Sequence, residues 1–112
     1  MPDFVFAYRN PVGYTPTPDT RAAWTAWFDG MGQQLADLGK PAVARAALGN
    51  CGADRTELGG YSVIQADDLE SAMTIAKGCP HLTRGGGVEV GQLGEVPALR
   101  QPSGAVNAPG SR

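Results

Sequence analysis

The chain has 112 residues, of which 42% are hydrophobic and 18% are charged, and its net charge at neutral pH is -2. These values are typical of one small globular domain and exclude an intrinsically disordered chain. The slightly acidic balance, with no segment dominated by Lys and Arg, argues against binding to nucleic acid.

The N-terminal residues and the cysteines bear on the compartment. The start MPDFVF has no signal-peptide pattern, and the longest apolar run is far too short to span a membrane. Two cysteines, Cys51 and Cys79, do not make a disulfide framework. We therefore expect a cytoplasmic protein with reduced thiols and no membrane partner.

The first predicted element is a strand over residues 3–9. Phe4 and Phe6 alternate there with Val5 and Ala7, so both faces of the strand are apolar. This pattern predicts a central strand that is covered on both sides. Residues 10–18, with three prolines and one glycine, are predicted to be a loop.

A long amphipathic helix follows. Apolar residues recur at three- and four-residue intervals over residues 23–38, and the opposite face is polar. The pattern predicts a helix that is capped by Asp19 or Thr20 and ended by Gly39 and Pro41.

Two features of this region leave alternatives open. Gly30 and Gly32 lie inside the predicted helix, where they mark either close packing against the sheet or a kink. Residues 41–49 are rich in alanine, but they lie between a helix stop and a glycine-punctuated loop at 50–58. We predict a short second strand there.

Residues 59–90 hold a second strand–helix–strand unit. A β-favouring strand at 61–66 leads into a helix capped by Asp67, and a glycine-rich turn leads into a last strand at 88–93. The helix ends before Pro80, because proline cannot continue the hydrogen-bond ladder.

The predicted order βαββαβ indicates an α+β, ferredoxin-like fold, an antiparallel sheet with both helices on one face. This domain would occupy residues 1–93. Residues 94–112, with three prolines, three glycines and no aromatic residue, are predicted to form a C-terminal tail. The other sheet face would be open and apolar, and we expect a second copy to cover it in a homodimer.

The motif LGGYSVIQADDLESAMTIAKGCPHLTRGGGVEV at residues 58–90 carries a family resemblance. With the FVFAYR strand and the AAWTAWF helix ending in LGKP, it resembles the YCII-related family of the dimeric α/β barrel group. The likeness covers residues 3–93, and GCPHL followed by GGxVEV marks one branch. It implies a ferredoxin-like subunit that pairs as a dimeric α/β barrel.

The resemblance does not transfer a catalytic pair. Dehydrochlorinase-like relatives are thought to use a histidine at the start of the first helix and an aspartate in an Asp-Pro segment after the second. Here the first helix has no histidine, and Cys79 precedes Pro80 where the aspartate would stand. The DGPF motif of another branch is also absent. Some DGPF-type relatives are associated with alternative sigma factors, which implies a regulatory alternative.

Two neighbouring residues are the candidates for catalysis. His81, the only histidine, is a candidate acid or base, and the alternative is a turn histidine that bonds the last helix carbonyls. Cys79 would be a nucleophile if His81 lowered the pKa of the thiol. A helix C-terminus disfavours a thiolate, so a small buried thiol is the alternative.

Four aromatic residues are the candidates for substrate binding, between the first helix and the sheet. They are Tyr8, Trp24, Trp27 and Phe28, and the same spacing is also typical of an ordinary core. Cys51, Cys79 and His81 lack metal-ligand spacing, and we predict neither a metal site nor a cofactor.

These features lead to two functional hypotheses. The first is a protein that binds or transforms a small, partly apolar metabolite, between the first helix and the sheet or at the dimer seam. The alternative is a non-catalytic dimeric interaction or regulatory accessory module, for which the proline-containing tail would provide docking.

Overall fold

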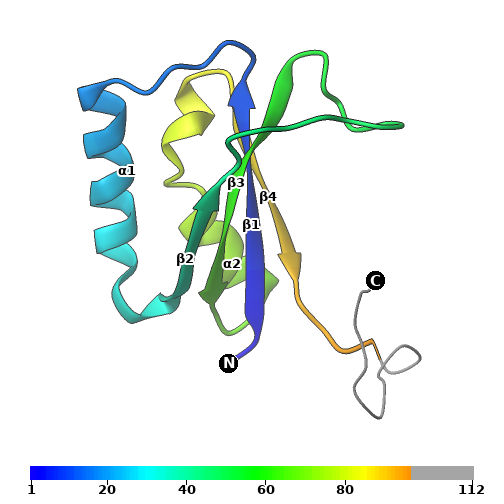
Figure 1. Cartoon of the computed structure of the whole chain (residues 1–112). Helices are drawn as coiled ribbons and strands as arrows, with labels where there is room; N and C mark the ends of the chain where they lie inside the picture. Colours follow the sequence, from blue (N-terminus) through cyan, green and yellow to red (C-terminus); the bar gives the residue numbers. More distant parts are fainter. Residues whose placement is uncertain (97–112) are drawn as a thin grey trace.

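The computed structural model describes residues 1–96, in which two helices cover one face of a four-stranded antiparallel sheet (Figure 1). The strands lie in the order β2-β3-β1-β4, which is the ferredoxin-like arrangement, so the predicted fold class is confirmed. The elements are β1 (Asp3–Pro11), α1 (Pro18–Met31), β2 (Leu35–Pro41), β3 (Thr56–Gln65), α2 (Leu69–Ala76) and β4 (Gly87–Gln92), with the short 3₁₀ helices η1 (Gly32–Gln34) and η2 (Pro80–Thr83).

The core lies between the helices and one face of the sheet. Alternate residues of β1 are buried, and the residues paired with them on β3 and β4 point to the same side. Each large apolar side chain buried there stabilises the fold by about 1.5–3 kcal/mol. The buried apolar residues are Phe4, Phe6, Tyr8, Met31, Ile64, Ala66, Ala72, Ala76 and Cys79.

The other face of the sheet is open in the single chain. Val5 pairs with Val63 and Ala7 with Tyr61, and these four side chains are not buried; Tyr61 is 42% exposed. The prediction that β1 is covered on both sides is therefore met by this chain on one face only. β1 is nevertheless central, between β3 and β4.

The first helix starts earlier than predicted. Thr17, not Asp19 or Thr20, is the N-cap, and its hydroxyl accepts a hydrogen bond from the Thr20 amide at 3.2 Å. Pro18 occupies the first helical position, where its missing N–H costs nothing. Thr20 completes the capping box, because its hydroxyl accepts from the Thr17 amide.

The first helix also ends earlier than predicted, and the predicted position of the second strand is therefore wrong. Gly32 has φ +57° and caps α1, so the alternative of a kink within the helix does not arise. A Cβ at Gly30 or Gly32 would meet nothing within 4 Å, so the alternative of close packing against the sheet is wrong as well. The chain then forms β2 at Leu35–Pro41, and residues 41–49, predicted as the strand, form bends and coil beyond Pro41. Leu35 pairs with Ile64 and packs against the core, so its apolar side chain falls on the helical spacing of α1 although the residue belongs to β2.

The β1–β3 pair is longer than predicted. β1 continues to Pro11, which pairs with Thr56, so part of the predicted loops at 10–18 and 50–58 is strand. The rest of the β2–β3 connection extends away from the sheet (Figure 1).

Smaller differences concern the second half of the chain. Asp68, not Asp67, caps α2 and accepts from the Ser71 amide at 2.8 Å. The predicted tail at 94–112 lies outside the described residues apart from its first three. Within residues 1–96, no helix is long and apolar enough to cross a membrane.

Gly39 provides a test of this strand assignment. Its φ is +75°, and a Cβ there would overlap the carbonyl oxygen of Tyr61 on β3. We expect Gly39→Ala to lower the free energy of unfolding by more than about 2 kcal/mol, measured by urea denaturation. Gly30→Ala is the matched control: a Cβ at Gly30 meets nothing within 4 Å, so alanine should stabilise α1 by about 0.5–1 kcal/mol. Equal stability of the two variants would contradict the assignment.

Candidate functional site

A cleft of about 800 Å³ lies between α1 and the β2–β3 side of the sheet. Trp24 and Phe28 of α1 line one side of the cleft together with Tyr8 of β1. The β2 side is lined by Lys40, Ala42, Val43 and Arg45. His81, from η2, closes one end. The volume falls within the range of about 300–1,000 Å³ that is usual for small-molecule sites.

Aromatic rings give the cleft a rigid apolar wall. The ring of Trp24 contacts Tyr8 edge-on at 4.8 Å and tilts against Phe28 at 5.6 Å. Such contacts stabilise ring pairs by about 0.5–1.5 kcal/mol beyond the burial of their area. The first helix thus presents aromatic faces to the cleft rather than only to the core.

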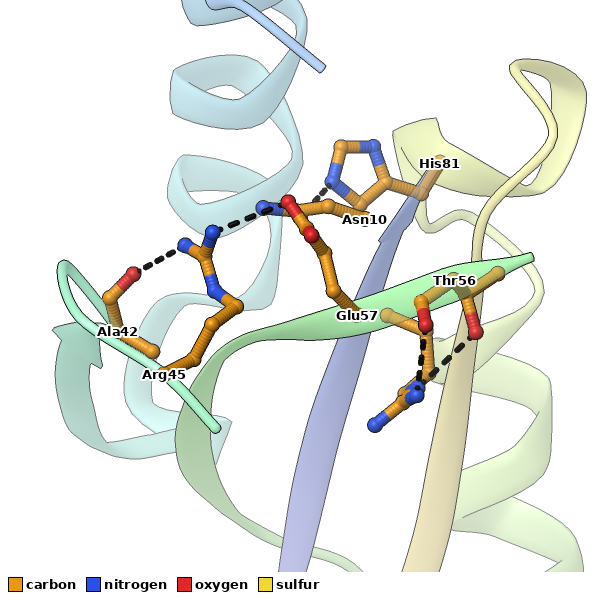
Figure 2. Close-up of polar contacts among 7 residues, drawn as sticks. Asn10, Ala42, Arg45, Thr56, Glu57 and His81 are labelled. Atoms are coloured by element: carbon orange, nitrogen blue, oxygen red, sulfur yellow. Dashed lines mark hydrogen bonds and ion pairs between the residues drawn. The ribbon is translucent and has the colours of Figure 1, made fainter. Parts of the chain in front are cut away.

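His81 is held in place on three sides. Its side chain is 2% exposed, and the rings of Tyr14 and Trp24 each meet the imidazole edge-on at 4.8 Å. Its Nε2 lies 2.6 Å from Oδ1 of Asn10 on β1 (Figure 2). Since an amide oxygen only accepts, Nε2–H is the donor and the neutral ring keeps a lone pair on Nδ1.

The Nδ1 atom of His81 is buried and has no hydrogen-bond partner within residues 1–96. Burial lowers the pKa of His81 below its ordinary value, and the nearby Arg84 cation lowers it further. The imidazole is therefore neutral at physiological pH, with a proton-accepting atom that the described protein leaves unused.

Tyr8 offers a second polar atom without a partner. Its side chain is 6% exposed, and within the described residues its buried hydroxyl has only the Ser62 hydroxyl beside it, without the geometry of a full hydrogen bond. Burial raises the pKa of Tyr8 well above its ordinary value, and the adjacent Ser62 hydroxyl, which itself donates to the Leu38 carbonyl, offsets only part of that rise. The phenol is a neutral donor.

Two glycines make room for the contact between Asn10 and His81. Gly59 lies at the bulge where the β1–β3 register shifts, and a Cβ there would overlap the Asn10 amide. Gly86 packs against His81, where a Cβ would come within 3.0 Å of the histidine Cβ. The glycine-rich turn thus packs closely against His81, and the Gly86 amide donates a hydrogen bond to the His81 carbonyl at 3.0 Å.

Arg45 ties the outer wall of the cleft to β3. Its guanidinium pairs with Glu57 at 3.0 Å and also donates to the carbonyl of Ala42 (Figure 2). Glu57 is the β3 partner of Asn10, so this ion pair lies beside the Asn10–His81 contact. Because Arg45 bonds both Glu57 of β3 and the Ala42 carbonyl, it connects residues 42–45 to the sheet.

Two of the predicted site residues do not line the cleft. Trp27 stacks on Phe6 with ring centroids 6.0 Å apart, and its indole N–H donates to the Ile75 carbonyl at 3.2 Å. Cys79 is 3% exposed within the core, and burial raises the pKa of its thiol. Tyr8, Trp24, Phe28 and His81 do line the cleft.

Sequence reasoning missed the polar residues that complete the cleft. Asn10 and Tyr14 fall in a segment predicted as a loop, and Lys40 and Arg45 fall in a region whose strand was misplaced. No periodic signal identifies such residues, because long-range pairing places them. Within residues 1–96, no group of three His, Cys, Asp or Glu side chains is arranged to hold a metal ion.

Comparison with known proteins gives a fold relative. No family model matches the chain, and no curated protein matches it. Among solved structures, the chain is similar to the 5-chloro-2-hydroxyhydroquinone dehydrochlorinase (TftG) of Burkholderia phenoliruptrix AC1100, in complex with 2,5-dihydroxybenzoquinone. The two share 18% sequence identity with a TM-score of 0.53, over 85% of this chain and 97% of that chain. The likeness establishes a shared fold.

The pH dependence of stability tests the state of His81. Its pKa is lowered in the fold, so below about pH 6.5 the unfolded chain binds more protons than the native state. We expect the free energy of unfolding to fall as the pH drops below about 6.5, by at most about 1.4 kcal/mol per pH unit from this one group.

Because His81 is the only histidine, His81→Gln should remove most of this slope in urea unfolding at each pH. A slope of the same size in the variant would contradict the assignment.

Proposed function

We propose that this protein binds a small, partly apolar metabolite in the cleft between α1 and the β2–β3 side of the sheet. The observation that carries the proposal is Nδ1 of His81, a buried polar atom with no hydrogen-bond partner within residues 1–96, in a cleft that has an aromatic wall and is also lined by Tyr8, whose buried hydroxyl has only the Ser62 hydroxyl beside it. A buried polar atom without a partner costs about 1–3 kcal/mol. A ligand that pairs with these atoms, once the side chains that shield them move aside, recovers part of that cost.

The two atoms have complementary roles. The Tyr8 hydroxyl donates a hydrogen bond to a ligand oxygen, and Nδ1 of neutral His81 accepts one from a ligand hydroxyl or amine. Asn10 fixes the tautomer that leaves Nδ1 free. We assign His81 the role of proton acceptor in any transformation of the ligand. Cys79 has no part in this proposal, because it lies in the core outside the cleft.

The fold relative supports a small-molecule role. The dehydrochlorinase holds a quinone in the same fold, and the match spans 97% of its length. Together with the motif at residues 58–90, this likeness supports a place for the chain in the YCII-related family. The histidine–aspartate pair expected of dehydrochlorinase-like relatives is absent here, so we propose the binding of a small molecule and not that relative's reaction.

We also propose that two copies pair through the open face of the sheet. The face formed by Val5, Ala7, Tyr61 and Val63 is apolar and partly exposed on adjacent central strands. A contiguous exposed apolar surface on central strands is unusual in a monomer. A two-fold axis would bring the same residues of both copies together.

Retention of a ligand is the test of the cleft. Native mass spectrometry of gently purified protein should show added small-molecule mass. Tyr8→Phe and His81→Gln should each weaken retention by about 2- to 10-fold, because each removes one hydrogen bond. The control is Cys51→Ser, which alters an exposed residue that does not line the cleft. Bare protein that also binds nothing from a metabolite extract would contradict the proposal and favour the interaction module.

The dimer has a separate test. Val63→Asp places a charge in the open face and should convert a dimer to monomers at micromolar concentration, measured by light scattering on a sizing column. Val12→Asp is the control, since Val12 is 57% exposed and follows β1 outside that face. A wild-type protein that is monomeric at this concentration would refute the pairing.

A further inference from the structure

The charges around the cleft are of one sign. The chain as a whole is slightly acidic, with 11 acidic and 9 basic residues. Among the residues that line the cleft, however, Arg21, Lys40 and Arg45 are basic and none is acidic. Within the described residues, the cleft is therefore a basic patch on an acidic protein, which the bulk composition does not explain.

The three cations are not equivalent. Arg45 is paired with Glu57 at 3.0 Å, so much of its charge is balanced inside the protein. Arg21 and Lys40 have no ion pair within residues 1–96. Arg21 comes from α1, and Lys40 comes from the end of the edge strand β2, where it pairs with Tyr61. A ligand at the rim of the cleft is therefore near two cations that have no ion pair within residues 1–96.

The interior of the cleft is apolar and uncharged, whereas its rim is positively charged. Trp24, Phe28 and Tyr8 form the apolar part, and Tyr8 and His81 remain neutral there. Burial in such a lining disfavours a charged ligand group, whereas the exposed rim tolerates one. The ligand's charge therefore belongs at the rim and its apolar body inside.

From this arrangement we propose that the cleft selects an organic carboxylate, with a planar apolar body against Trp24 and Phe28 and the carboxylate between Arg21 and Lys40. This inference rests on the proposed function and adds the charge class of the ligand. A guanidinium matches a carboxylate with two parallel N–H donors, and an ammonium adds a point charge. Arg45 keeps its place on Glu57 and holds the outer wall.

A matched pair of probes tests the proposal: 2-naphthoate and the neutral isostere 2-naphthamide, titrated into the full chain and followed by amide chemical shifts. The carboxylate should bind about 10-fold more tightly than the amide at low salt and lose this advantage as salt is raised. Shifts should concentrate at α1 and β2.

Three variants separate a rim contact from general charge. Arg21→Gln and Lys40→Gln should each weaken naphthoate binding by about 2- to 5-fold, as expected of exposed charges, and leave naphthamide binding unchanged. Lys77→Gln removes the same charge from an exposed site that does not line the cleft and should change neither.

The outcomes distinguish the two proposals. Naphthamide bound in the cleft as tightly as naphthoate, or equal losses for both probes in Arg21→Gln and Lys40→Gln, would overturn the carboxylate preference and leave the binding function standing. Failure of both probes to shift any cleft residue up to about 5 mM would count against the cleft as an apolar binding site, and both proposals would fall.

Discussion

The hydrogen bond between His81 and Asn10 joins two parts of the chain that are 71 residues apart. It connects the end of β1 to the turn after α2, and it lies where α1, the sheet and η2 meet. Much of the surrounding structure depends on it. Gly59 leaves space for the Asn10 amide, and Gly86 lies close to the Arg9 carbonyl and the His81 Cβ. Trp24 and Tyr14 support the ring at its sides. A chain selected only for packing would fill this place with an aliphatic side chain, which has no polar atoms to satisfy.

The cleft combines contacts that hold its walls in place with buried polar atoms that lower the stability of the fold. The aromatic contacts and the Arg45–Glu57 ion pair hold its walls, while the buried Tyr8 hydroxyl and Nδ1 of His81 lower the stability of the empty protein. Natural proteins accept such local losses mainly where binding or chemistry benefits from a prepared site. Trp27, one turn from Trp24, shows the contrast, because its indole N–H is fully used on a helix carbonyl. Of the two tryptophans on α1, Trp24 therefore lines the cleft and Trp27 packs in the core.

Much of the fold could be predicted from the sequence, because it rests on local signals. Alternation in β1, the helical spacing of α2 and the glycines and prolines at element ends predicted the order of strands and helices. β2 could not be placed, because Leu35 and Leu38 continue the helical spacing of α1 by coincidence. The positive φ of Gly32 ends the helix first. Four of the six candidate residues line the cleft, whereas Asn10, Arg21 and Lys40 could be found only through pairing across the sheet and the docking of α1.

The separation of Asn10 and His81 has a consequence for biosynthesis. The ribosome makes β1, α1 and β2 first, so the residues of both sides of the cleft are present in the nascent chain before η2 leaves the exit tunnel. The imidazole arrives only after β3 and α2, and with it the turn that closes the end of the cleft. A ligand present during translation meets a complete site only on the finished fold. Its binding energy therefore favours the native protein over every partly made or partly folded form.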